Sequence, residues 1–232
     1  MTSLKHMRKA AALAGLLGAA LLAAPAQAVL LTGDGAASTG QTGSNFAGEL
    51  TYSFSSATAA TLTLDLSNTT TPAAVGGYLT AFVLNNPGDN IGSVTLSSAP
   101  TADWSLLGLD NDNVNGAPFG QFDFGATSGN VNGGFEGGGN PATGLGVGQS
   151  GTFVFALTGT NLDTLNDLSF VNELSSGPGQ GQDAQFLVAR FRGLANEGSD
   201  KVPGAVVPEP STYAMLLAGL GLLGFGVRRM RN

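Results

Sequence analysis

Hydrophobic and polar residues alternate along residues 46–54 and 61–66 of this 232-residue chain. On one side of the first stretch lie Phe46, Gly48, Leu50, Tyr52 and Phe54. The other side carries Glu49, Thr51 and Ser53, and in the second stretch three leucines alternate with Thr61, Thr63 and Asp65. Because successive side chains of a strand point to opposite faces, this period of two predicts antiparallel strands with one buried face.

Six further segments read as strands and are separated by turns rich in Asn, Pro, Gly and Ser: 78–84, 92–97, 120–125, 151–158, 167–174 and 185–193. The first of them is an apolar run, which is typical of a central strand. We find no convincing amphipathic helix between residues 29 and 195. About eight short strands predict an all-β fold, a single antiparallel β-sandwich of the jelly-roll or Ig-like type, over residues 29–195.

Three connecting segments stand out by composition. Residues 130–151 contain nine glycines and Pro141, which predicts a mobile surface loop; without a lysine it is no phosphate-binding loop. Residues 175–183, rich in Ser, Gly and Gln, form a second connector. Residues 196–207 are polar and then rich in Pro and Val, which predicts a linker.

The first 28 residues have the organisation of a secretory signal peptide. Lys5, Arg8 and Lys9 precede an apolar stretch at 10–24, and Ala26 and Ala28 supply the small residues of a cleavage site. Signal peptidase is therefore an expected processing enzyme, and we expect the mature chain to start at Val29.

The last 25 residues, 208–232, combine three features in order. Pro208, Glu209 and Pro210 come first, an apolar run covers 213–227, and the arginines Arg228, Arg229 and Arg231 follow. A helix of fifteen residues is about 22 Å long, shorter than the roughly 30 Å hydrocarbon core. The arginines favour a cytoplasmic end, so that everything before the motif lies outside. A C-terminal core helix is the alternative, but a buried helix rarely ends in three arginines.

These three features resemble the PEP-CTERM sorting tail of exported bacterial proteins. The resemblance implies processing by a membrane-embedded exosortase, with the arginine cluster retained on the cytoplasmic side. It also implies passage through the inner membrane, arrival at the cell surface or outside the cell, and a role with exopolysaccharide in a biofilm or matrix. If the tail is not removed, it instead anchors a surface domain.

Charge is distributed very unevenly between residues 29 and 207. This range contains fifteen acidic residues but only three basic ones, Arg190, Arg192 and Lys201. Nucleic acid is therefore excluded as a partner, because phosphate binding requires clustered Lys and Arg. In alternation Arg190 and Arg192 share one face of a strand, and we expect them to pair with carboxylates across the strand.

The mature chain lacks the residues of most hydrolytic mechanisms. It has no cysteine, and the only histidine, His6, lies in the signal peptide. Catalysis by a histidine base or by a His/Cys zinc site is thus excluded, and no cofactor is implied. A carboxylate pair remains as the alternative, a polysaccharide-active enzyme. Its candidates are Asp103, Asp110, Asp112, Asp123, Glu136 and Glu173. We expect a non-catalytic structural or binding module instead, with solvated carboxylates.

Two further binding hypotheses rest on local sequence. Asp110 and Asp112, in an Asp/Asn-rich segment before Gly116, resemble calcium ligands, although Val114 interrupts the spacing. An Asp/Asn-rich turn that satisfies its own backbone is the commoner structure. Trp104, the sole tryptophan, is a candidate platform for a sugar ring, but a lone tryptophan in a β-sandwich is usually part of the core.

Overall fold

The computed structural model describes residues 28–108 and 113–208. The predicted signal peptide up to residue 27, the calcium candidates Asp110 and Asp112, and the tail from residue 209 onward lie outside the described residues. Ala28 and Pro208, at the two processing junctions, lie within them. Among the described segments, no helix is long and apolar enough to cross a membrane.

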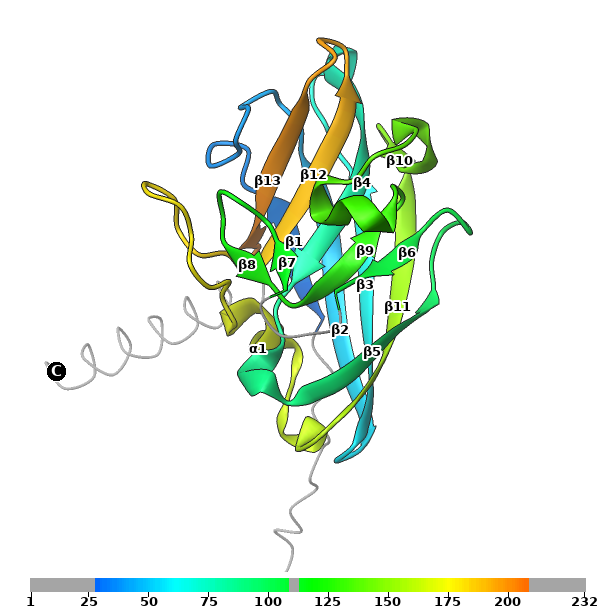
Figure 1. The fold of residues 1–232 in the computed structure, drawn as a ribbon, viewed down its shortest axis with the longest axis vertical. Helices are drawn as coiled ribbons and strands as arrows, with labels where there is room; N and C mark the ends of the chain where they lie inside the picture. The colour runs from blue at the N-terminus through cyan, green and yellow to red at the C-terminus, as the bar shows by residue number, and fades with distance from the viewer. Residues whose placement is uncertain (1–27, 109–112, 209–232) are drawn as a thin grey trace, which may run out of the picture.

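The described chain is mostly β-strand, with antiparallel pairing throughout (Figure 1). The strands are β1 (Val29–Gly33), β2 (Phe46–Ser56), β3 (Ala59–Asn68), β4 (Gly76–Leu84), β5 (Ile91–Ser98), β6 (Ser105–Leu107), β7 (Val114–Asn115), β8 (Gln121–Phe122), β9 (Phe124–Thr127), β10 (Leu145–Gly146), β11 (Ser150–Gly159), β12 (Leu187–Leu194) and β13 (Ser199–Val206). The helical segments are α1 (Asp167–Asn172) and the 3-10 turns η1 (Ala73–Val75), η2 (Pro87–Asp89), η3 (Val131–Glu136), η4 (Pro141–Thr143) and η5 (Leu162–Thr164).

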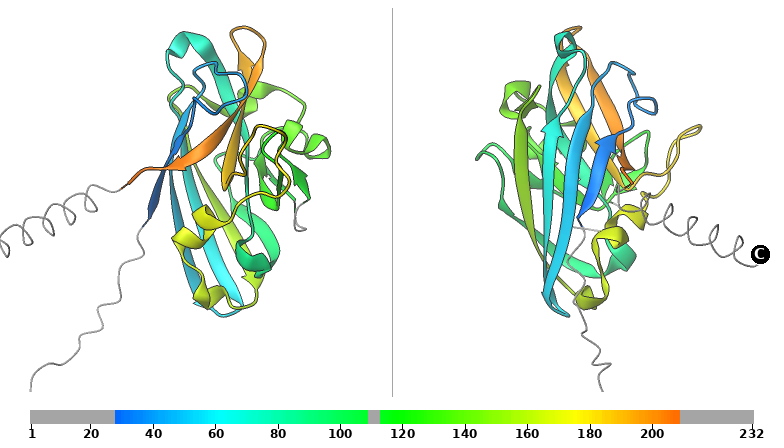
Figure 2. Two further views of the ribbon diagram at one scale, coloured as in Figure 1. Left: turned by 90° about the vertical axis from the view of Figure 1, so that its left-hand side faces the viewer. Right: turned by 180° about the vertical axis from the view of Figure 1, so that it is seen from behind.

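One large sheet contains most of these strands. Its order is β5-β11-β3-β2-β1-β13-β12-β4-β9-β6, with β10 added beside β4, and β7 and β8 form a separate pair. The first half of β13 pairs with β12 and its second half pairs with β1, so this strand carries the sheet from one layer into the other (Figure 2). The sheet is thereby curled until it nearly closes into a barrel. The all-β, antiparallel prediction is confirmed, whereas two separate sheets of a jelly-roll or Ig-like sandwich are not established.

The alternation read from the sequence matches the register of β2 and β3. Leu50 pairs with Leu64 and Tyr52 pairs with Leu62, and all four side chains are buried. Phe54 is an exception, because it is 52% exposed rather than inward-facing. It lies at the end of the β2–β3 hairpin, where a register shift follows it, and so projects beyond the core.

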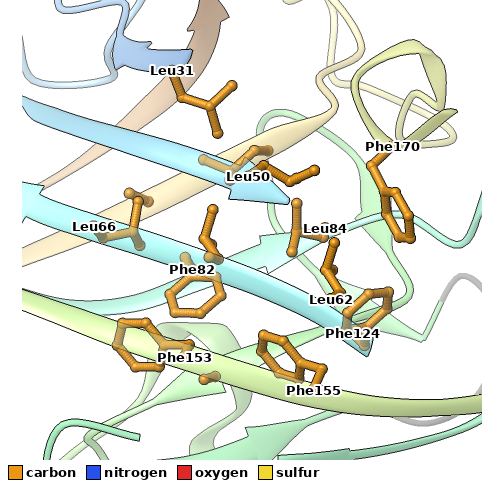
Figure 3. Close-up of a cluster of buried hydrophobic side chains, with 14 of the residues drawn as sticks. Leu31, Leu50, Leu62, Leu66, Phe82, Leu84, Phe124, Phe153, Phe155 and Phe170 are labelled. Carbon is orange, nitrogen blue, oxygen red and sulfur yellow. The ribbon is translucent and has the colours of Figure 1, made fainter. Parts of the chain in front are cut away.

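Aromatic side chains from several strands form the centre of the core (Figure 3). Phe82 and Phe153 pack edge to face with ring centroids 4.7 Å apart, and Trp104 packs against Phe153 at 4.6 Å. Trp104 is only 6% exposed. The structure therefore places Trp104 in the core, and its ring offers no open face to a sugar.

A second apolar cluster covers the outer face of β4. Ala81 and Val83 point into it, together with Phe135 of η3, while Phe82 and Leu84 point into the main core. Both faces of β4 are therefore covered, which explains the apolar run at 78–84. The segment 130–151, which was predicted to be a mobile surface loop, instead contains η3, η4 and β10. It also buries the side chain of Phe135.

Two other predictions are corrected. Residues 167–174, predicted as a strand, contain the helix α1; its capping box joins Asn166 and Ser169, and Asp167, Phe170 and Val171 are buried at a helical spacing. Residues 196–207, predicted as a linker, contain β13, which is hydrogen-bonded to neighbours and carries the buried Val202. The short polar segment 196–198 is only the turn before it.

Candidate functional site

The three basic residues of the described chain meet on one surface. Arg190 and Arg192 lie two residues apart on β12, so they share a face, and Arg190 stands opposite Lys201 of β13 in the register. Like charges directly opposite each other destabilise a sheet. This arrangement therefore requires a counter-ion.

Glu136 supplies that counter-ion from the glycine-rich segment. One of its carboxylate oxygens accepts from Nη1 of Arg190 and the other accepts from Nζ of Lys201. The buried ring of Phe135 fixes the position of Glu136, and Lys201 Nζ lies 5.8 Å from the centre of that ring. Burial alone would raise the pKa of Glu136, but the hydrogen bond from Lys201 and the charge of Arg190 together hold it below its usual value. Glu136 is thus the shared carboxylate partner of Arg190 and Lys201.

The two arginines differ in how fully their N–H groups are used. Arg190 is only 9% exposed; its Nη1 donates to Phe135 O (3.4 Å) and to Glu136, while its buried Nε has no partner. Arg192 donates to Gly138 O (3.2 Å) and Gly139 O (3.3 Å). No ion pair of Arg192 occurs within the described residues. Arg190 therefore pairs with a carboxylate as expected, but from η3 and not across the strand, whereas Arg192 pairs with no carboxylate of the described residues.

The pKa of Arg192 is consistent with the absence of a carboxylate partner among the described residues. Burial lowers the pKa of Arg192, and the nearby positive charge of Arg190 lowers it further. The guanidinium remains charged at neutral pH, because arginine is far too strong a base to lose its proton there. A carboxylate brought to this place would relieve the repulsion between the two arginines.

An open groove of about 440 Å³ lies beside these arginines. It is lined by Pro141, Arg190, Arg192, Gly193, Leu194, Glu197, Gly198 and Ser199. The turn between β12 and β13 forms one side: Glu197 donates its backbone N–H to Leu194 O, and Gly193 has a positive φ with the Pro141 ring beside it. The groove thus combines two cations, one carboxylate and the ring of Pro141, whereas the side chain of Leu194 belongs to the main core.

The predicted catalytic carboxylates have structural partners. Asp103 is exposed and bonds with Thr101. Asp123 is buried and accepts from the backbone N–H of Asn86 (2.6 Å), while Glu173 accepts from that of Gly88 (3.0 Å). The structure therefore brings Asp123 and Glu173 to the same turn around η2. Among the described residues, no group of three or more His, Cys, Asp and Glu side chains is arranged to hold a metal ion.

Asp200 is an important buried polar residue that the sequence did not predict. Asp200, in the segment predicted as a linker, is 1% exposed and accepts five hydrogen bonds from residues 38–42. Burial would raise its pKa, but hydrogen bonds from Thr42, Gly40 and Thr39 outweigh this and lower it. Asp200 fixes the loop between β1 and β2 to β13. Its only sequence signal is the Ser/Thr-rich composition of that loop.

Comparison with protein families matches residues 206–231 to the PEP-CTERM protein-sorting motif. This region contains the sorting motif at 208–210 and begins at the last residue of β13. Comparison with curated proteins and with solved structures gives no match. The chain is therefore a protein with a PEP-CTERM motif, which marks it for export and for sorting by exosortase to the cell surface.

Proposed function

We propose that this exosortase substrate is a non-catalytic surface module that binds acidic exopolysaccharide through the groove beside Arg190 and Arg192. The observation that carries the proposal is the state of Arg192, a partly buried cation that lies in a groove and pairs with no carboxylate of the described chain. The groove is also the place where the cations of an otherwise acidic domain gather.

Uronic acid units suit the chemistry of this groove. An arginine fork binds a carboxylate through parallel N–H bonds, and Arg192 uses only two of its five N–H groups on backbone carbonyls. Pro141 offers apolar contact to the C–H face of a sugar ring, and Glu197 offers an acceptor for a hydroxyl. The acidic surface elsewhere repels a polyanion, so that binding is confined to the groove.

A single shallow groove gives weak affinity for one sugar unit. Many copies displayed on one cell surface, or many uronic acids along one polymer, raise the effective concentration of each further contact. This behaviour suits a matrix or biofilm component, which holds a polymer without modifying it. In this proposal the protein passes through the inner membrane, is cut by signal peptidase and exosortase, and then acts at the cell surface or outside it.

The alternative, a carboxylate-dependent polysaccharide-active enzyme, has one feature in its favour: Asp123 and Glu173 lie at the same turn. Each carboxylate, however, already accepts a backbone N–H of residues 86–88. Both side chains thereby fix the turn, and Asp123 is buried. The groove does not include either residue.

Retention on immobilised polygalacturonate tests the proposal, with neutral dextran as the reference polymer. The processed protein should be retained only by the acidic polymer and should release no reducing ends. Arg192→Gln should weaken retention about tenfold or more, because a charged hydrogen bond is worth roughly 1.5–3 kcal/mol. Lys201→Gln changes net charge equally but lies outside the groove lining, so it is the matched control.

Equal retention on both polymers would contradict the proposal that the groove binds an acidic polymer. An equal loss of retention in Arg192→Gln and Lys201→Gln would contradict it as well. Release of oligosaccharides that is abolished by Asp123→Asn, with folding intact, would replace the binding proposal by the enzyme.

A further inference from the structure

The sorting motif begins where the folded sheet ends. The second half of β13 pairs with β1 through Gly204 with Gly33, Ala205 with Thr32, and Val206 with Leu31. Val207 then donates its backbone N–H to Leu30 O at 2.8 Å. Pro208, the first residue of the motif, follows at once. The chain therefore has no free linker residue between the sheet and the motif.

The predicted start of the mature chain lies at the same end of the same strand pair. Val29 is the first residue of β1, and β1 runs antiparallel to β13. Both processing junctions thus leave the fold side by side. A protease that cuts at either junction meets the folded β1–β13 end directly.

A membrane protease needs the substrate backbone near its cleavage site free and extended. Proteins that capture extended peptides form main-chain hydrogen bonds to them, and a strand already paired with a neighbour cannot offer the same groups. Residues 204–207, just before the motif, have such partners in β1. Pro208 has no backbone N–H, so the pairing ends there.

We propose that residues 204–207, the end of β13 and the residue after it, form with residues 30–33 a latch that must open before exosortase can bind and cut the chain at the motif. The last pair of this latch is weakly held by burial, because Leu30 and Val207 remain 38% and 37% exposed. In the pair before it, Val206 is 43% exposed, and only its partner Leu31 is buried. Ends of strands with little buried apolar surface open locally at low cost. Processing of the folded protein is therefore limited by the opening of the β1–β13 end.

The latch is tested by the rate of tail removal from the full-length chain in exosortase-containing cells, followed by pulse–chase and intact mass. Insertion of Gly-Ser-Gly-Ser between Val207 and Pro208 supplies the missing free backbone, and we expect cleavage several-fold faster than in the parent chain. The same insertion in the exposed connector at Gly177 is the matched control and should leave the rate unchanged.

A second variant tightens the latch. Thr32→Cys with Ala205→Cys places two cysteines at paired positions of a chain that has none of its own. Once oxidised, it should be cut several-fold more slowly, and reductant should restore the rate.

An insertion at 207/208 that leaves cleavage unchanged or slower, or a disulfide-linked chain that is cut at the parent rate, would overturn the latch. Failure of the parent chain to be cut at all would overturn the processing premise itself. Neither result depends on polysaccharide binding, because the groove lies at the other end of β13.

Discussion

Replacing Asp200 by asparagine should destabilise the fold strongly while hardly changing its shape. Oδ1 of Asp200 accepts from Thr39 Oγ1 (3.0 Å) and Gly40 N (2.7 Å). Oδ2 accepts from Ser38 Oγ (3.2 Å) and from both N (3.2 Å) and Oγ1 (2.7 Å) of Thr42. An amide NH₂ in place of either oxygen faces a backbone N–H that it cannot satisfy.

The magnitude follows from the bonds that are lost. In either orientation of the amide one backbone N–H loses its charged acceptor, which costs about 1.5–3 kcal/mol, and the bonds to the remaining oxygen lose the carboxylate charge, whereas the hydroxyls can rotate toward new partners. We therefore expect the free energy of unfolding to fall by about 3 kcal/mol at pH 7. That is a large share of the roughly 5–15 kcal/mol that stabilises a typical domain.

The stabilisation that Asp200 contributes should decrease as the pH falls. The pKa of Asp200 is lowered in the folded state, whereas an unfolded aspartate titrates at about 3.9. The carboxylate therefore contributes its full stabilisation above about pH 4 and loses it as the pH falls through the folded value. The difference between parent and Asp200→Asn should shrink below about pH 4.

Urea unfolding of the exported domain, followed by the fluorescence of the buried Trp104, measures both effects. Asp183→Asn, at an exposed aspartate, is the matched control. If the free energies of unfolding of the parent and of Asp200→Asn differ by less than about 0.5 kcal/mol at pH 7, the carboxylate does not stabilise the fold as argued. A difference that stayed constant down to pH 2.5 would refute its dependence on the charge.

Three further predictions concern the core, the groove and the tail. Trp104→Ala should lower the free energy of unfolding by about 3–5 kcal/mol, measured by circular dichroism in urea, whereas Phe54→Ala at an exposed ring should cost less than about 0.5 kcal/mol. Glu136→Gln removes a negative charge beside the groove and should increase retention on polygalacturonate at low salt; weaker retention would contradict the proposed anion site. Alanines at 208–210 should leave the precursor uncut, and an intact mass that lacks the tail would contradict this.

The strand prediction worked where burial falls on one face. In β2 and β3 each residue's environment follows from its position in the strand, so alternation alone identifies the buried side. Phe54 fails because exposure at a hairpin tip depends on where the core ends, which no local pattern records. In α1 the local cap formed by Asn166 and Ser169 outweighed a composition that resembles a strand.

Long-range polar contacts could not be predicted in the same way. Asp200 meets its partners across about 160 residues of sequence, as in the bond from Thr39 Oγ1 with a separation of 161. Its segment is polar and then rich in Pro and Val, so it resembles a linker until the partners are known. The prediction of β13 failed partly for this reason, since its pairing with β1 is equally distant in sequence, although its pairing with β12 is local.

The groove was predictable only in part. A spacing of two places Arg190 and Arg192 on one face of any strand, which sequence alone establishes. The two arginines have different partners because of η3. The buried Phe135 holds Glu136 next to Arg190, whereas Arg192 donates to backbone carbonyls. A glycine-rich composition gave no sign that this segment would carry a fixed carboxylate.

β13 links the groove to the sorting tail. Its first residue, Ser199, lines the groove, and its last, Val206, borders the motif. Seven residue steps of about 3.3 Å separate these ends by about 23 Å. The groove therefore lies well away from the junction with the sorting motif. The proposed polymer binding at one end of the strand and the proposed latch at the other involve different residues, so we expect a substitution in the groove to leave the rate of tail removal unchanged.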